Sequence, residues 1–137
     1  MKLITKETDY ALRALLNLAR EDGYLSSREI AGREGIPLHF LRRILQSLIK
    51  AGVIESREGV SGGVKLKARP EKIHLTDIIE IFQGRIQLSE CVFRKKICTN
   101  HATCVIRKRI EKIESLVANE FGNTTIADLI QDQEAKA

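Results

Sequence analysis

The stretch SSREIAGREGIPLHFLRRILQSLIKAG, from Ser26 to Gly52, predicts two helices joined by a tight turn. Ser26 and Glu29 have the spacing of a capping box, in which a hydroxyl and a carboxylate satisfy each other's free backbone amides at a helix start. This first helix is short, because Gly35 is placed to end it. Pro37 then opens a longer helix, which is expected to stop at Gly52.

The longer helix has one apolar side and one polar side. Its apolar positions recur at helical spacing: Leu41, Ile44, Leu45, Leu48 and Ile49. Its outer positions are polar and largely cationic: Arg42, Arg43, Gln46, Ser47 and Lys50. The following stretch, VIESREGVSGGVKLKAR, has two short β-prone runs around Gly59, Gly62 and Gly63, which predicts a hairpin. Two helices, a tight turn and a hairpin describe a winged helix-turn-helix, whose second helix enters the DNA major groove.

The flanking segments predict further helices. Apolar side chains recur at helical spacing in residues 5–19, and Gly23 is the expected C-cap of that helix. The segment LTDIIEIFQG, Leu75–Gly84, predicts a helix packed on the first half of the chain. With only 4% aromatic residues and no Trp, the core is expected to be aliphatic.

The net charge of +5 comes entirely from the first half of the chain. Residues 1–70 carry 13 Lys/Arg and 8 Asp/Glu, whereas residues 71–137 carry 10 of each. An unbalanced basic half favours a polyanionic partner, and nucleic acid is the commonest one. The alternative is a basic face that is merely solvated.

A second long helix is predicted near the C-terminus. Its apolar residues alternate at intervals of four, three and four, which is the seam of a helix that pairs with another helix. They are Ile106, Ile110, Ile113 and Val117. This pattern predicts a homodimer, although a helix that packs on its own subunit is the alternative. The segment TTIADLI, Thr124–Ile130, predicts a short last helix capped by Thr124 or Thr125.

All three cysteines lie in CVFRKKICTNHATC, residues 91–104, with the spacing C-x6-C-x5-C. Zinc sites usually contain a close C-x2-4-C pair, which is missing from this stretch. The chain also lacks a signal-peptide pattern and an apolar run of membrane-spanning length, so we expect a cytoplasmic protein, in which structural disulfides are rare. The spacing therefore favours a metal or redox site, and thiolates are the usual ligands of iron–sulfur clusters. Three unrelated thiols that pack as small hydrophobes are the alternative.

These motifs, in this order, resemble the IscR, NsrR and RirA group of bacterial winged-helix regulators over residues 1–131. The resemblance rests on TDYALRALL, the capped short helix, FLRRILQSLIKAGVIESREG, LTDIIEIF, the three cysteines ahead of the long helix and TTIADLI. It implies a dimeric transcription factor that binds a 2Fe–2S or 4Fe–4S cluster through these cysteines. It also implies that the state of the cluster changes DNA binding.

The chain departs from parts of this family pattern. IscR-like members take a fourth ligand from a histidine at the position of Arg107, which cannot serve as one. NsrR-like members use an aspartate of the partner subunit, and Asp9 matches that position. This match favours a 4Fe–4S cluster, with 2Fe–2S and a fourth ligand from His101 or an exogenous group left open. The wing also differs, because Glu58 separates Arg57 from Gly59.

The predicted fold class is mostly α (α+β). We expect a winged helix-turn-helix DNA-binding domain at 1–84, a cysteine-bearing loop at 85–104, a dimerisation helix and a short packing helix at 105–131, and a frayed tail at 132–137. The predicted DNA-contacting residues are Ser27, Arg28, His39, Arg42, Arg43, Arg57, Ser61, Gly62, Lys65 and Lys67. The predicted metal ligands are Cys91, Cys98, Cys104 and Asp9 from the partner subunit.

The predicted function is a transcriptional repressor that binds a palindromic double-stranded operator and senses redox state, nitric oxide or iron supply through its cluster. The alternative is a metal-free or zinc-bound regulator whose thiols sense oxidants directly. An enzyme is not expected, because the chain has no phosphate loop and no nucleophile–base motif. Neither a membrane nor a small-molecule substrate is expected as a partner.

Overall fold

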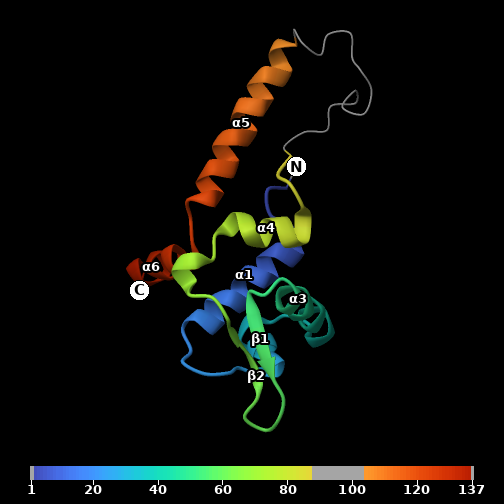
Figure 1. Cartoon of the computed structure of the whole chain (residues 1–137), viewed down its shortest axis with the longest axis vertical. Coiled ribbons are helices and arrows are strands. Elements are labelled where there is room, and N and C mark those ends of the chain that lie inside the picture. Colours follow the sequence, from blue (N-terminus) through green and yellow to red (C-terminus); the bar gives the residue numbers. More distant parts are fainter. Residues whose placement is uncertain (1, 88–103, 137) are drawn as a thin grey trace.

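The computed structural model describes residues 2–87 and 104–136. Its elements, in chain order, are α1 (Lys6–Ala19), α2 (Ser27–Glu34), α3 (Leu38–Lys50), β1 (Ile54–Arg57), β2 (Gly63–Leu66), the 3-10 helix η1 (Pro70–Lys72), α4 (Leu75–Gln83), α5 (Val105–Gly122) and α6 (Ile126–Ala135). The described residues are mostly helical with one two-stranded sheet, which confirms the predicted fold class (Figure 1). No helix within these two ranges is long and apolar enough to cross a membrane.

The helix-turn-helix forms where the capping pattern predicted it. The Ser26 hydroxyl accepts a hydrogen bond of 3.1 Å from the Glu29 backbone N–H, and this caps α2. The Glu29 carboxylate accepts from the Ser26 hydroxyl at 3.3 Å, instead of from the Ser26 backbone as a full capping box would require. Gly35 ends α2 in the left-handed conformation, with φ of 66°. The chain then reaches Pro37, which precedes the first turn of α3.

The core is aliphatic and centred on α1, which contacts α2, α3, α4 and α6. Among the described residues, its largest fully buried apolar side chains come from five of the helices and from the wing: Leu15, Ile30, Leu41, Leu48, Ile54, Ile78, Ile79 and Ile126. Burying one such side chain stabilises the fold by about 1.5–3 kcal/mol. Because Ile126 belongs to this set, α6 shares the core of the winged-helix domain.

The wing is an antiparallel pair in which Ile54 faces Leu66 and Arg57 faces Gly63. Leu25 extends the pairing, since its N–H and C=O bond to Val64 at 2.9 and 2.8 Å. Gly63 has φ of 139°, and a Cβ there would clash with the Leu25 carbonyl. The wing is therefore attached to the segment before α2 along a glycine backbone that tolerates no side chain.

A second backbone pairing joins the C-terminal helices to the winged-helix domain. The Leu75 N–H donates to the Thr124 carbonyl at 2.9 Å, and the Ile126 N–H donates to the Ile73 carbonyl at 3.0 Å. We call this pair of bonds the clasp. It lies between the start of α4 and the junction of α5 with α6.

Two helix ends differ from the predictions. Gly23 is not the C-cap of α1, because the helix ends at Ala19 and the Arg20 N–H bonds back to the Asn17 carbonyl in an ordinary right-handed conformation. The last helix is longer than predicted and continues through Ala135, where we expected a frayed tail. Its N-cap is Thr125, and the residues after Ile130 are largely compatible with a helix, so it propagates beyond TTIADLI.

Candidate nucleic-acid interface

The outer face of α3 is exposed and cationic. The side of the helix that faces the core is buried at Leu41, Ile44, Leu45 and Leu48. The opposite side exposes His39, Arg42, Arg43, Gln46 and Lys50 to solvent. Figure 1 shows α3 and the wing on the same half of the molecule, whereas α5 extends away from the opposite end. The geometry is that of a helix free to enter a groove, with a hairpin beside it.

Arg42 and Arg43 occupy different surroundings, although they are adjacent. The guanidinium carbon of Arg43 lies 5.1 Å from the centre of the Phe40 ring, which itself packs edge-on against Tyr10 at 5.6 Å. Arg42 is exposed, and no side chain in the described part of the chain pairs with it. Consecutive residues leave a helix about 100° apart. Arg42 is therefore more readily available than Arg43 to contact a base edge. Arg43 instead points toward Phe40, which packs on Tyr10 of α1.

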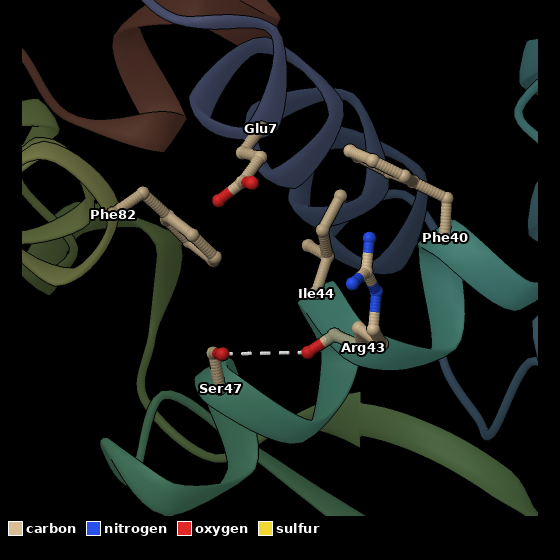
Figure 2. A pocket seen from close by; sticks show the side chains of 6 residues that line it. All are labelled: Glu7, Phe40, Arg43, Ile44, Ser47 and Phe82. Atoms are coloured by element: carbon tan, nitrogen blue, oxygen red, sulfur yellow. Dashed lines mark hydrogen bonds between the residues drawn. The ribbon is translucent and has the colours of Figure 1, made fainter.

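A cleft of about 140 Å³ lies beside Arg43, between α1, α3 and α4. Glu7 and Phe82 reach into it from α1 and α4, opposite Ile44 and Ser47 on α3 (Figure 2). The Ser47 hydroxyl donates to the Arg43 carbonyl at 3.3 Å, so it is occupied within α3. The sequence patterns do not reveal this cleft, because its walls come from three separate helices.

The wing presents three of the predicted cations. Arg57 and Lys67 are exposed, and Lys65 is half-buried. Arg57 and Lys65 both lie over the ring of Tyr24, at 5.1 and 5.8 Å from its centre. Sequence analysis missed Tyr24, because it lies in the connection before α2, far along the chain from the strands that it contacts.

The remaining predicted DNA contacts are also accessible. Arg28 is exposed on the first turn of α2, next to the half-buried Ser27. Ser61 is exposed in the turn of the wing, and Gly62 beside it is half-buried. A Cβ on Gly62 would clash with the Arg57 carbonyl, so this position is shaped by the turn itself. Every predicted DNA-contacting residue is thus at least partly exposed, and whether each touches DNA stays a prediction.

Asp9, the predicted ligand for the partner's cluster, is half-exposed on α1 and paired with Arg13. Its carboxylate oxygen lies 2.9 Å from the Arg13 Nε, and Arg13 also approaches Glu34 of α2 at 3.7 Å. The hydrogen bond with Asp9 and the charge of Asp9 raise the pKa of Arg13, with Glu34 adding to the effect. A cavity of about 330 Å³ between α1 and α6 is bounded by Asp9, Arg13 and Leu129. The carboxylate is accessible, but a metal would have to share it with a guanidinium.

The cysteine site falls mostly outside the described residues. Cys91, Cys98 and His101 are not among them, whereas Cys104 is a half-buried free thiol at the N-cap of α5. No group of three or more potential metal ligands occurs in residues 2–87 and 104–136. Arg107, at the position of the IscR-like histidine, pairs with Glu111 at 2.9 Å. The predicted ligand set therefore stays a prediction.

The long helix α5 has no buried residue in the described structure. Its exposed apolar side chains are Val105, Ile106, Ile113 and Leu116, with exposed fractions of 73%, 68%, 49% and 60%. Ile110 and Val117 are half-buried and lie on the same side of the helix as Ile106 and Ile113. The predicted seam residues thus line one side of α5 as an apolar stripe, and Val105 and Leu116 lie about 80–100° around the helix from it. α5 contacts α4, and its Phe121 packs on the core, whereas the stripe residues Ile106 and Ile113 are exposed. Exposed apolar side chains grouped in this way mark an interaction surface.

Comparisons with known proteins agree with this architecture. Residues 4–132 match the Rrf2 family, described as "Iron-dependent Transcriptional regulator". The HTH-type transcriptional regulator NsrR of Shouchella clausii is 28% identical, over 96% of this chain and 90% of the relative. Among solved structures, CymR, the global cysteine regulator of B. subtilis, has a TM-score of 0.82 at 26% identity, covering 96% of this chain and 98% of its own. T. potens IscR has a TM-score of 0.79 at 26% identity, covering 100% and 92%.

Proposed function

Because this chain belongs to the Rrf2 family of transcriptional regulators, we propose that it acts as a homodimeric repressor whose operator affinity depends on an iron–sulfur cluster. One observation carries the proposal furthest: the exposed cationic face of α3 lies on the same half of the molecule as a cationic wing (Figure 1). The family membership supports DNA binding, and homologous regulators imply that the chain is not an enzyme.

In the proposed complex, α3 reads bases and the wing contacts phosphates. Arginine in the major groove pairs with guanine through two hydrogen bonds, which discriminates one base from another. Lys and Arg on the wing neutralise phosphates and release counterions, which supplies affinity without sequence information. The apolar stripe of α5 supports a two-fold dimer, and a two-fold protein fits a palindromic operator with two half-sites.

Arg42→Ala is expected to weaken specific binding by about 1–3 kcal/mol, because a base contact of two hydrogen bonds is lost. Arg43→Ala is expected to weaken operator binding less than Arg42→Ala does, because the Arg43 guanidinium already lies over the Phe40 ring. The measurement is equilibrium binding to an operator selected from randomised duplexes. Lys108→Ala removes one charge from the polar side of α5 and is the matched control, for which we expect little change. If both arginine variants bind the operator as tightly as the wild type, α3 does not enter the major groove.

The proposed cluster is held by Cys91, Cys98 and Cys104, with Asp9 of the partner subunit as the fourth ligand. Thiolates suit such clusters, and a carboxylate is a harder and weaker ligand for iron. The half-buried free thiol of Cys104 and the half-exposed carboxylate of Asp9 fit this donor set. When bound, such a cluster supplies reactivity toward oxidants or nitric oxide and a dependence on iron supply. A 4Fe–4S cluster is favoured by the NsrR-like aspartate, and 2Fe–2S is the other candidate.

A second candidate function is a regulator whose thiols sense oxidants directly, either metal-free or with zinc. The likeness to CymR favours it, because that protein is the global cysteine regulator of B. subtilis. Anaerobically purified protein separates the two functions by its colour and metal content. A brown protein with broad visible absorption and bound iron is the result expected for a cluster. A colourless protein that contains stoichiometric zinc, or no metal, would instead support the second candidate.

A further inference from the structure

Tyr24 is surrounded by the charged residues of the wing. The charged ends of Arg57 and Lys65 lie 5.1 and 5.8 Å from the centre of its ring. Its hydroxyl donates a hydrogen bond of 3.2 Å to a carboxylate oxygen of Glu55. One half-buried side chain before α2 thus contacts three charged residues of the β1–β2 hairpin. Neither the proposed base contacts nor the cysteine site accounts for this arrangement.

The ring has a fixed position with respect to the hairpin. Tyr24 precedes Leu25, which is 4% exposed and bonds to Val64 of β2 through both its backbone N–H and C=O. The two main-chain bonds hold the segment before α2 against the wing. An aromatic side chain attached to this segment therefore acts as a platform that moves with the hairpin.

The strand pairing explains why two cations share one ring. Glu55 faces Lys65 across the sheet, and Arg57 faces Gly63. Residues 55 and 57 lie on the same face of β1, because side chains alternate along a strand. Gly63 carries no side chain opposite Arg57, and the backbone of Leu25, the residue after Tyr24, occupies the space that a side chain there would need. The negative face of the ring and the Glu55 carboxylate offset the repulsion between the two nearby cations.

We infer that Tyr24 is a positioning residue for DNA binding: it holds Arg57 and Lys65 together on one face of the wing, ready to contact the DNA backbone. This inference rests on the proposed function. A long, free cationic side chain loses rotamer freedom when it contacts a phosphate. If part of that freedom is already lost in the unbound protein, binding costs less. The hydroxyl has a second effect, because it holds the Glu55 carboxylate, which would otherwise be free to pair with Lys65, its neighbour across the sheet.

The test compares Tyr24→Leu with Tyr24→Phe. The probe is a fluorescent 30-base-pair duplex of random sequence, and binding is measured over a range of NaCl concentrations, so that no operator is needed. Tyr24→Leu is expected to weaken binding roughly three- to tenfold, because both cation–π contacts disappear. Tyr24→Phe retains the ring, and its loss of DNA affinity, on a logarithmic scale, is expected to be less than half of the loss in Tyr24→Leu. Thermal unfolding of each variant shows whether it is folded.

A double-mutant cycle with Arg57→Gln separates positioning from a structural role. In the wild-type background, Arg57→Gln is expected to weaken binding and to reduce the slope of log affinity against log salt by about 1. In the Tyr24→Leu background, the same change is expected to cost clearly less, because the guanidinium is no longer positioned. A purely structural tyrosine would leave the cost of Arg57→Gln equal in both backgrounds.

The failures are distinguishable. Wild-type protein that binds neither random nor selected duplexes would overturn the proposed function, and the inference would fall with it. Wild-type protein that binds DNA, with Tyr24→Leu equal to it or with no coupling to Arg57, would overturn only the positioning role. Tyr24→Phe as weak as Tyr24→Leu would also overturn the role of the ring and assign the effect to the hydroxyl.

Discussion

Ile113→Glu is expected to convert the dimer into monomers. Ile113 lies within the apolar stripe of α5 and is 49% exposed in the single chain, so a partner helix is expected to cover it. In a two-fold interface, the substitution would bury two carboxylates without partners. A loss of roughly 3 kcal/mol or more corresponds to a rise in the dimer dissociation constant of about 100-fold or more. Analytical ultracentrifugation across a concentration series measures this change directly.

The matched control for the interface is Ser115→Glu. Ser115 is exposed on the polar side of the same helix, and its substitution adds the same carboxylate without entering the stripe. We expect this variant to remain dimeric. Monomeric Ile113→Glu should also lose operator affinity, since one subunit reaches only one half-site. If Ile113→Glu remains a well-folded dimer, the interface lies elsewhere than on α5.

Cys98→Ala is expected to abolish the proposed cluster and its visible absorption. Removing one of three thiolates leaves a carboxylate and two thiols, which is a poor ligand set for iron–sulfur chemistry. DNA affinity should then no longer depend on iron supply or on treatment with oxidants. The measurements are the absorption spectrum, the iron content and operator binding with and without anaerobic reconstitution. Visible absorption and iron content equal to those of the wild type would overturn the cysteine ligand set.

Asp9→Ala tests the ligand from the partner subunit separately. We expect a cluster that forms but is lost faster, together with a weaker link between the state of the cluster and DNA affinity. Arg13→Gln is the control, because it removes the ion-pair partner of Asp9 and leaves the carboxylate in place. It should retain the cluster, since the competing guanidinium is gone. If Asp9→Ala matches the wild type in both spectrum and DNA binding, His101 or an exogenous ligand becomes the better candidate.

The parts of the fold that depend on neighbouring residues were predictable from the sequence. Ser26, Gly35 and Pro37 act within a few residues of their own positions, so their pattern indicates where α2 and α3 begin and end. The wing was predictable for the same reason, because its glycines and β-prone runs are adjacent in the chain. The prediction at Gly23 was wrong, because a glycine after a helix is not required when the helix ends in a right-handed turn.

The contacts that depend on the folded chain were not predictable. Tyr24 meets Arg57 only because the Leu25 backbone pairs with β2, and no local pattern encodes that pairing. Arg13 reaches Glu34 because α1 packs against α2. The cysteine spacing, in contrast, indicates a kind of chemistry without indicating a geometry. Two of the three thiols lie outside the described residues, and the site therefore rests on residue types and on family resemblance.

The clasp affects how the two winged-helix domains of a dimer would be positioned relative to each other. It holds the C-terminal end of α5 against Ile73 and Leu75, which follow the wing and η1 in the chain. With 18 residues, α5 is about 27 Å long, and the clasp fixes its C-terminal end to the winged-helix domain. If α5 tilts by about 10° about the clasp, its N-terminal end moves by roughly 5 Å, given that length. In a dimer joined through α5, each winged-helix domain would be attached to one of two crossing helices. The crossing angle of the two α5 helices would therefore determine the distance between the two wings.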